Sequence, residues 1–134
     1  MTVQLTKDSI DLGIVVKDSD ASLAFYRDTL GFEPAGDNPM PGGMHMWRLM
    51  CGTSMIKLVK SERGPKAEAP LGGINGANGY RYWTISVSNL DELVAQCEAG
   101  GYKVAVPVTE IRPGTSIAIV EDPDGNWVEF LKAT

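Results

Sequence analysis

The chain has 134 residues, 43% hydrophobic and 22% charged, a composition that suits one globular domain with its own core. Its net charge of −5 disfavours nucleic acid and anionic lipid as partners, because like charges repel. The sequence has neither a run of about 18 apolar residues nor a basic start followed by an apolar stretch, so we expect no membrane partner. The two cysteines, Cys51 and Cys97, form no motif with each other or with His45, which predicts a reducing, cytoplasmic location.

The first half of the chain predicts the element order β-α-β-β-β. The expected elements are a strand over residues 10–16, a helix that ends near residue 30, a short strand near 33–36, and a hairpin whose second strand covers 55–60. Ser19 or Asp20 is the expected helix cap. Gly52 occupies the first central position of the expected hairpin turn, where glycine is favoured.

The second half repeats the same order about 71 residues later. The expected elements are a strand over residues 81–87, a helix that ends near residue 100, a short strand near 102–107, and a final strand over 127–132 after the turn at 122–126. Asn89 and Glu92 have the spacing of a capping box, and Gly100 or Gly101 suits the left-handed position after the helix.

The repeat predicts an α+β fold in which two βαβββ modules form a cupped mixed sheet with the helices on the outside. We expect a single domain over residues 1–134, with module one at about 9–60 and module two at about 79–132. The Gly- and Pro-rich segment at about 61–78 is the expected linker, and it could be a mobile lid over the cup.

Strand alternation predicts which side chains face the cup. Leu58 and Phe130 should face the helices, whereas their neighbours Lys57 and Glu129 should face the interior of the cup. By the same alternation Asp11 and Tyr82, at equivalent places in the two first strands, face the cup. A polar residue between apolar neighbours in a strand needs such a cavity, because burial without a partner is costly.

Three segments resemble the vicinal oxygen chelate superfamily, the group of glyoxalases, bleomycin-resistance proteins and extradiol dioxygenases. The segments are Asp11-Leu-Gly-Ile-Val-Val-Lys-Asp18, Phe25-Tyr-Arg-Asp-Thr-Leu-Gly-Phe32 and Glu121-Asp-Pro-Asp-Gly-Asn-Trp-Val-Glu-Phe130. Together with the repeat, the resemblance covers residues 9 to 132. It implies the fold more strongly than the chemistry, since the superfamily contains lyases, epimerases, dioxygenases, thiol transferases and non-catalytic drug-binding proteins.

The resemblance also implies where a metal would bind. Metal-dependent members use four cup-facing residues, one pair from each module, and the matching positions here are Asp11, Tyr82, Lys57 and Glu129. Asp11 and Glu129 supply oxygen ligands, but Tyr82 would be an unusual ligand and the Lys57 ammonium has no lone pair to donate. A catalytic metal site needs about three good protein ligands. The residues present at these positions therefore favour a cup without a metal cofactor, and one divalent ion bound by Asp11, Glu129 and His45 is the alternative.

The same positions have two other uses. Lys57 and Glu129 could form an ion pair that closes the bottom of the cup. Alternatively, Lys57, Tyr82 and Glu129 are catalytic residues that orient a ligand or move its protons. The sequence leaves open whether the protein is an enzyme or a binding protein.

The hairpin around Gly52 supplies further candidate ligand-binding residues. With Gly52-Thr53 as a two-residue turn, Met50 lies opposite Met55, Arg48 opposite Lys57 and Met46 opposite Val59, all facing the cup. A turn shifted by one residue would instead place His45 and Trp47 in the cup. Methionines form an adaptable apolar wall, and an arginine recognises carboxylate or phenolate. Trp127 shares the face of Glu129 and is a further candidate for the lining.

The combined prediction is a protein that binds a small, partly apolar organic ligand in a metal-free cup, with acid–base chemistry on that ligand as a further use. A divalent-metal-dependent lyase, isomerase or dioxygenase of the same superfamily is the alternative. The resemblance also implies a homodimer.

Overall fold

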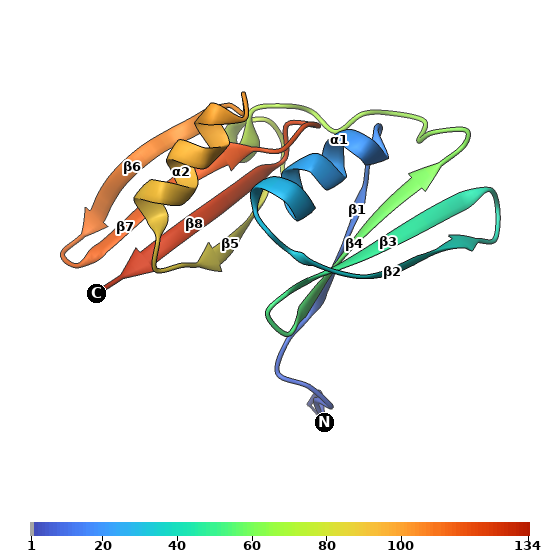
Figure 1. Cartoon of the computed structure of the whole chain (residues 1–134), viewed down its shortest axis with the longest axis horizontal. Helices are drawn as coiled ribbons and strands as arrows, with labels where there is room; N and C mark the ends of the chain where they lie inside the picture. Colours follow the sequence, from blue (N-terminus) through green and yellow to red (C-terminus); the bar gives the residue numbers. More distant parts are fainter. Residues whose placement is uncertain (1) are drawn as a thin grey trace. The chain divides into compact units, whose positions relative to one another are not determined.

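The computed structural model describes residues 2–134 and divides into two compact units, the first ending at Lys66 and the second beginning at Ala67 (Figure 1). The elements of the first unit are β1 (Asp11–Val15), α1 (Ser19–Leu23), the π-helical segment η1 (Ala24–Thr29), β2 (Glu33–Met40), β3 (Met44–Cys51) and β4 (Ser54–Ser61). Those of the second are the 3-10 turn η2 (Gly73–Asn75), β5 (Tyr82–Ser86), α2 (Leu90–Ala99), β6 (Val104–Arg112), β7 (Thr115–Glu121) and β8 (Trp127–Ala133). The predicted α+β repeat of βαβββ is confirmed.

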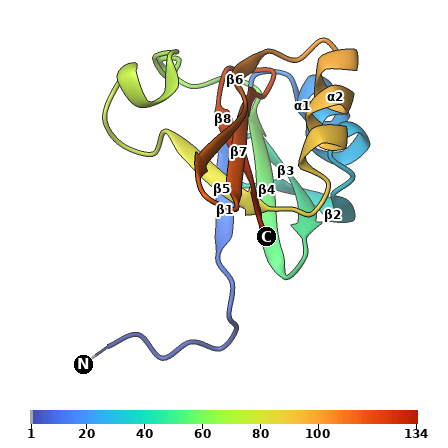
Figure 2. The same cartoon turned by 90° about the vertical axis from the view of Figure 1, so that its left-hand side faces the viewer.

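Each unit contains one four-stranded mixed sheet. The strand orders are β1-β4-β3-β2 and β5-β8-β7-β6, in which the first and last strands of a unit pair in parallel and all other pairs are antiparallel. A parallel pair needs a crossover connection, and the helix of each unit provides part of it. The helix lies against one face of its own sheet, as Figure 2 shows for α1 and α2 separately.

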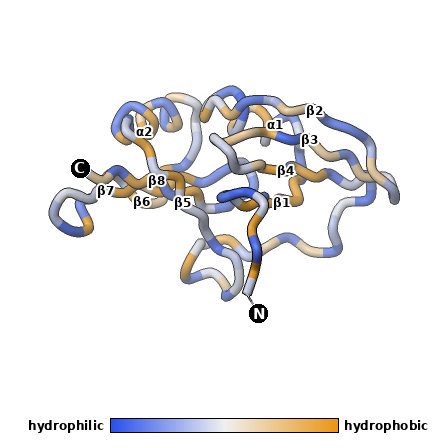
Figure 3. The backbone as a smooth tube through the Cα atoms, turned by 90° about the horizontal axis from the view of Figure 1, so that it is seen from below, coloured by the Kyte–Doolittle hydropathy of each residue, from blue (hydrophilic) through white to orange (hydrophobic). Residues whose placement is uncertain are grey.

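Burial follows the predicted alternation along the strands. Ile56 and Leu58 are fully buried while Lys57 between them is half-buried, and Val128 and Phe130 flank Glu129 in the same way. Figure 3 colours the backbone by hydropathy, and hydrophobic segments lie in the strands of each unit. We call the sheet face that carries Lys57 or Glu129 the helix-free face of its unit.

The first helix begins one residue earlier than expected. Asp18 is its cap, in an extended conformation, and its carboxylate accepts a hydrogen bond from the Ala21 amide at 3.1 Å. The helix then widens into η1, where the Leu30 amide donates to the Phe25 carbonyl at 2.9 Å. This wider turn accompanies the complete burial of two consecutive aromatic residues, Phe25 and Tyr26.

The second helix follows the sequence prediction closely. Asn89 occupies the cap position, although its side chain makes no capping hydrogen bond, and Gly101 adopts the left-handed conformation with φ +86°. The apolar residues at helical spacing i, i+3, i+4 and i+7 are buried: Leu90, Leu93, Val94 and Cys97.

Two strands are longer than expected. β2 reaches Met40 and β6 reaches Arg112, whereas short strands were expected near 33–36 and 102–107. Both strands have register shifts against their neighbours, and β2 contains two prolines and a glycine. These irregularities remove the two-residue alternation on which a sequence prediction depends. Within residues 2–134, no helix is both long enough and apolar enough to span a bilayer.

Candidate functional site

The helix-free face of the first sheet carries a small cluster of charges around Asp11. Strands β1 and β4 pair in parallel with Gly13 beside Lys57, and a side chain at Gly13 would meet no atom within 4 Å. The Lys57 side chain therefore has room to approach Asp11, and its Nζ lies 3.6 Å from Oδ2. Lys7 donates to the other carboxylate oxygen of Asp11 at 2.6 Å. One carboxylate is thus shared between two ammonium groups.

The charge state of Asp11 follows from these contacts. The hydrogen bond from Lys7 is the main cause that holds the pKa of Asp11 below its ordinary value, and the charge of Lys57 acts in the same direction. Asp11 is therefore a carboxylate at neutral pH and balances part of the positive charge on this face.

The strand pairing between β3 and β4 confirms the predicted turn at Gly52-Thr53. Arg48 lies opposite Lys57, Met50 opposite Met55 and Met46 opposite Val59. Arg48 donates from Nη1 to Oδ1 of Asn38, which holds the guanidinium on this face. Arg48 and Lys57 are two cations in directly opposed positions, an arrangement that is unfavourable unless an anion lies between or beside them.

On the other face of the same strands lie His45 and Trp47. His45 pairs with Lys60 and Trp47 with the buried Leu58, so both point to the helix-covered side of the sheet. The structure therefore does not bring His45 together with Asp11, which points to the helix-free side.

The second unit places Tyr82, Glu129 and Trp127 on its own helix-free face. Tyr82 pairs with Trp127, and Thr84 pairs with Glu129 and donates from Oγ1 to Oε1 at 2.6 Å. Tyr82 is 48% exposed, whereas Glu129 is half-buried. The Thr84 hydroxyl fixes one carboxylate oxygen and leaves the other available to a ligand.

The indole of Trp127 is held on both its edge and its face. Its Nε1 donates to Glu121 at 3.2 Å, and its ring lies so close to Gly73 that a Cβ there would be 2.1 Å from Cδ2. Only glycine fits at this contact. The segment before β5 is thereby packed against the end of β8.

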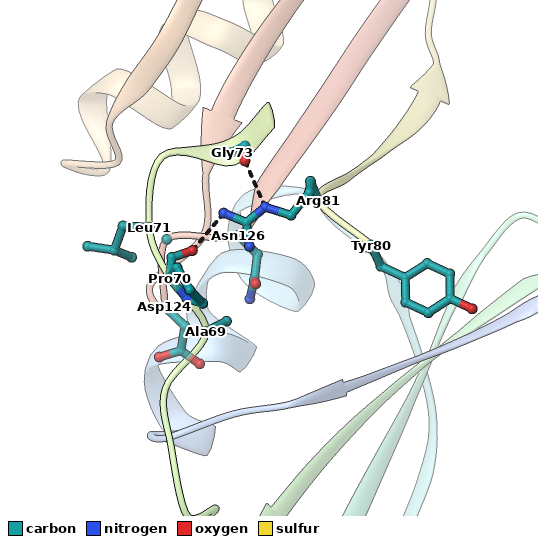
Figure 4. A pocket seen from close by; sticks show the side chains of 9 residues that line it. Ala69, Pro70, Leu71, Gly73, Tyr80, Arg81, Asp124 and Asn126 are labelled. Carbon is teal, nitrogen blue, oxygen red and sulfur yellow. Dashed lines mark hydrogen bonds between the residues drawn. The ribbon is translucent and has the colours of Figure 1, made fainter. Parts of the chain in front are cut away.

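Arg81 fixes the same segment by two hydrogen bonds (Figure 4). Its Nε donates to the Gly73 carbonyl at 2.7 Å and its Nη2 to the Pro70 carbonyl at 2.6 Å, while Tyr80 points away from this cluster. The small cavity beside the guanidinium has a volume of about 40 Å³, room for a water molecule and not for a ligand. The part of the predicted linker that follows Lys66 is thus attached to the second unit.

The donor groups do not fit the divalent ion that the resemblance implies. Lys57 occupies one ligand position with an ammonium group, and Asp11 already accepts from Lys7. Across residues 2–134, no three His, Cys, Asp or Glu side chains gather closely enough to hold a metal.

Sequence reasoning missed the polar partners that fix the site residues. They are Lys7 for Asp11, Asn38 for Arg48 and Thr84 for Glu129. Strand alternation from Tyr82 puts Thr84 on the same helix-free face, but only the parallel register between β5 and β8 identifies its partner. Lys7 and Asn38 lie in segments without a periodic pattern.

A repeated βαβββ unit with a mixed four-stranded sheet defines a fold class found in many proteins. The chain belongs to the Glyoxalase/Bleomycin resistance protein/Dioxygenase superfamily, whose family model matches residues 8–130. Among curated proteins it is similar to the uncharacterized protein PA2024 of Pseudomonas aeruginosa, with 27% identity over 124 residues that cover 89% of this chain and 84% of the relative.

Solved structures agree with this membership. A glyoxalase family protein from Bacillus cereus superposes with a TM-score of 0.84 at 17% identity, covering 98% of this chain and 96% of that one. The trypanothione-dependent glyoxalase I of Leishmania major superposes with a TM-score of 0.72 at 24% identity, covering 91% and 84%. At these identities the likeness concerns the fold alone.

Proposed function

We propose that this protein binds a small, partly apolar organic molecule with an anionic group, on the helix-free faces of its sheets and without a metal cofactor. The observation that carries the proposal is the opposition of Arg48 and Lys57, two cations with one nearby carboxylate, Asp11. A carboxylate or phenolate on the ligand would supply the missing negative charge.

The apolar part of the ligand has a matching surface on the same sheet face. The side chains that flank the two cations there are Met46, Met50, Met55 and Val59. Thioether side chains adapt to irregular apolar shapes, which suits a flat or branched hydrocarbon. An anionic head with an apolar body is therefore the class of ligand that this surface favours.

Acid–base chemistry on the bound ligand is the further part of the proposal. Lys57 on the first sheet is a candidate proton donor and Glu129 on the second a candidate acceptor, each for a ligand on its own sheet face, and Tyr82 and Trp127 would orient a ligand on the second. Glu129 is suited to this role because Thr84 occupies only one of its two oxygens. The protein is further proposed to be a homodimer and to lie in the cytoplasm. Light scattering of the purified protein would test the dimer.

The experiment compares two lysines on opposite faces of β4. Anthracene-9-carboxylate and its neutral amide are titrated by calorimetry against the wild type, Lys57→Met and Lys60→Met. Lys57→Met should lower the affinity for the carboxylate about five-fold, because a half-exposed charge pair contributes about 1 kcal/mol. It should leave the affinity for the neutral amide unchanged. Lys60→Met is the matched control and should bind the carboxylate as the wild type does.

Two results would overturn the proposal. Equal affinity of the wild type and Lys57→Met for the carboxylate would remove the assigned anion site. The second result has two parts: elemental analysis finds one tightly held divalent ion per chain, and ligand binding is lost on chelation and restored by that ion. It would favour a metal-dependent lyase, isomerase or dioxygenase instead.

A further inference from the structure

A second hollow lies within the first unit, on the helix-covered side of its sheet. It has a volume of about 580 Å³, within the range of ligand pockets, and we call it the His45 pocket. Its lining includes Pro39, Met40, Met44, His45, Trp47 and Glu62. The His45 and Trp47 rings are 4.4 Å apart at an angle of 49°. None of the roles proposed above uses this pocket.

The internal repeat explains why the hollow is there. Ser19 is the first residue of α1, and its counterpart Leu90 is the first residue of α2 and is 2% exposed. Ser19 lines the His45 pocket, and Leu90 lines the corresponding hollow of the second unit, which has only about 230 Å³. A small polar residue in place of a buried leucine leaves the larger space open.

The repeat also shows that the aromatic residues are not required by the fold. His45 pairs with Lys60 as Ser116 pairs with Lys132, and Trp47 pairs with Leu58 as Ala118 pairs with Phe130. The second sheet is thus built with serine and alanine at the two positions. Packing alone does not call for a histidine and a tryptophan beside an open hollow.

The polar groups of the pocket favour a cation. The Nε2 of His45 lies 2.7 Å from Oδ1 of Asp37, so this ring nitrogen donates to the carboxylate and the imidazole is held in place. Glu62 is fixed at the edge because its amide donates to the Gly43 carbonyl. The lining therefore carries one carboxylate, Glu62, and one ammonium, Lys60, and the partner of His45 adds a second carboxylate beside the pocket, in a chain of net charge −5.

We propose that the His45 pocket binds a planar aromatic molecule that carries a positively charged nitrogen. The indole of Trp47 attracts a cation to its face, and Met40 and Met44 contact the flat apolar body. The Glu62 carboxylate pairs with the charged nitrogen, and the His45 ring, held by Asp37, lies beside Trp47 at the wall of the pocket. This site is separate from the anion site, since it lies on the other face of β3 and β4.

The test uses two three-ring probes of similar size and opposite charge, the 9-aminoacridine cation and anthracene-9-carboxylate. We expect 9-aminoacridine to bind the wild type with one site per chain in this pocket. The double variant His45→Ser with Trp47→Ala gives the first unit the serine and alanine that the second unit has at these two positions. It should lower the affinity for 9-aminoacridine at least five-fold. Glu62→Gln should weaken it about three-fold, and Lys60→Met should bind it at least as tightly as the wild type.

The location is read directly from the NMR signals of the Trp47 indole and the His45 ring, which should shift on addition of 9-aminoacridine. The double variant must retain the wild-type circular dichroism spectrum; if it does not fold, Glu62→Gln and these signals decide the question. The proposal fails if 9-aminoacridine leaves the Trp47 and His45 signals unchanged, or if Glu62→Gln binds it as the wild type does. Loss of 9-aminoacridine binding in Lys57→Met alone would assign this probe to the opposite face and also overturn the proposal. Neither result bears on the binding of anthracene-9-carboxylate.

Discussion

Replacement of Gly73 by alanine tests how the segment before β5 is held against Trp127. Gly73 has φ +55°, where a residue with a Cβ costs about 1–2 kcal/mol. Its new Cβ would lie 2.1 Å from Cδ2 of Trp127, far inside the usual carbon contact of about 3.5–4.0 Å. Relief of such overpacking costs about 1–3 kcal/mol. We therefore expect Gly73→Ala to lower the free energy of unfolding by about 2–5 kcal/mol in total.

Gly64→Ala is the matched control. Gly64 also has a left-handed backbone, with φ +69°, but a Cβ there meets no atom within 4 Å. Gly64→Ala should lower the free energy of unfolding only by the cost of the left-handed backbone, about 1–2 kcal/mol. Urea denaturation followed by circular dichroism measures both values, and hydrogen exchange of residues 69–76 reports whether the segment is released in Gly73→Ala. Equal losses in the two variants would show that the Trp127 contact contributes nothing.

The remaining predictions concern the same framework. Arg81→Lys cannot reproduce two hydrogen bonds from one planar group, so proteases should cleave the segment before β5 faster than in the wild type; unchanged cleavage would contradict the role given to Arg81. Val128→Asp places an unpaired carboxylate at a fully buried position and should unfold the second unit, and a native-like melting curve would refute that placement. Burial raises the pKa of the Cys97 thiol to about 11. At pH 8 a disulfide reagent should therefore modify Cys51 in the folded protein and Cys97 only after denaturation. Rapid modification of both thiols would contradict the burial of Cys97.

The sequence predicted best where side chains alternate regularly. Lys57 and Glu129 lie between buried apolar residues, and this alternation predicts their faces from the sequence alone. The turn at Gly52-Thr53 was predicted from one glycine, although the sequence also allowed a register shifted by one residue. The strand pairing of β3 with β4 confirms the first register and places His45 on the helix-covered side.

Features that depend on long-range contacts could not be predicted in this way. The hydrogen bond from Thr84 to Glu129 joins residues 45 positions apart, and Arg81 binds carbonyls in a segment that has no periodic pattern. The π-helical turn η1 also could not be predicted, because the spacing of Leu23, Tyr26 and Leu30 fits an ordinary α-helix. Such details arise from packing rather than from local preference.

The two units hold similar residues at the positions needed for folding and different residues on their helix-free faces. Positions that both units need for folding hold apolar residues in both, such as Leu58 and Phe130, each at most 1% exposed. On the helix-free face the counterpart of Arg48 is Ile119, because Arg48 pairs with Lys57 and Ile119 pairs with Glu129. The first sheet thus carries two opposed cations at a place where the second sheet has a buried isoleucine and a carboxylate. Since the second unit forms the same sheet without those cations, the sheet itself does not require them, which supports the proposed anionic ligand.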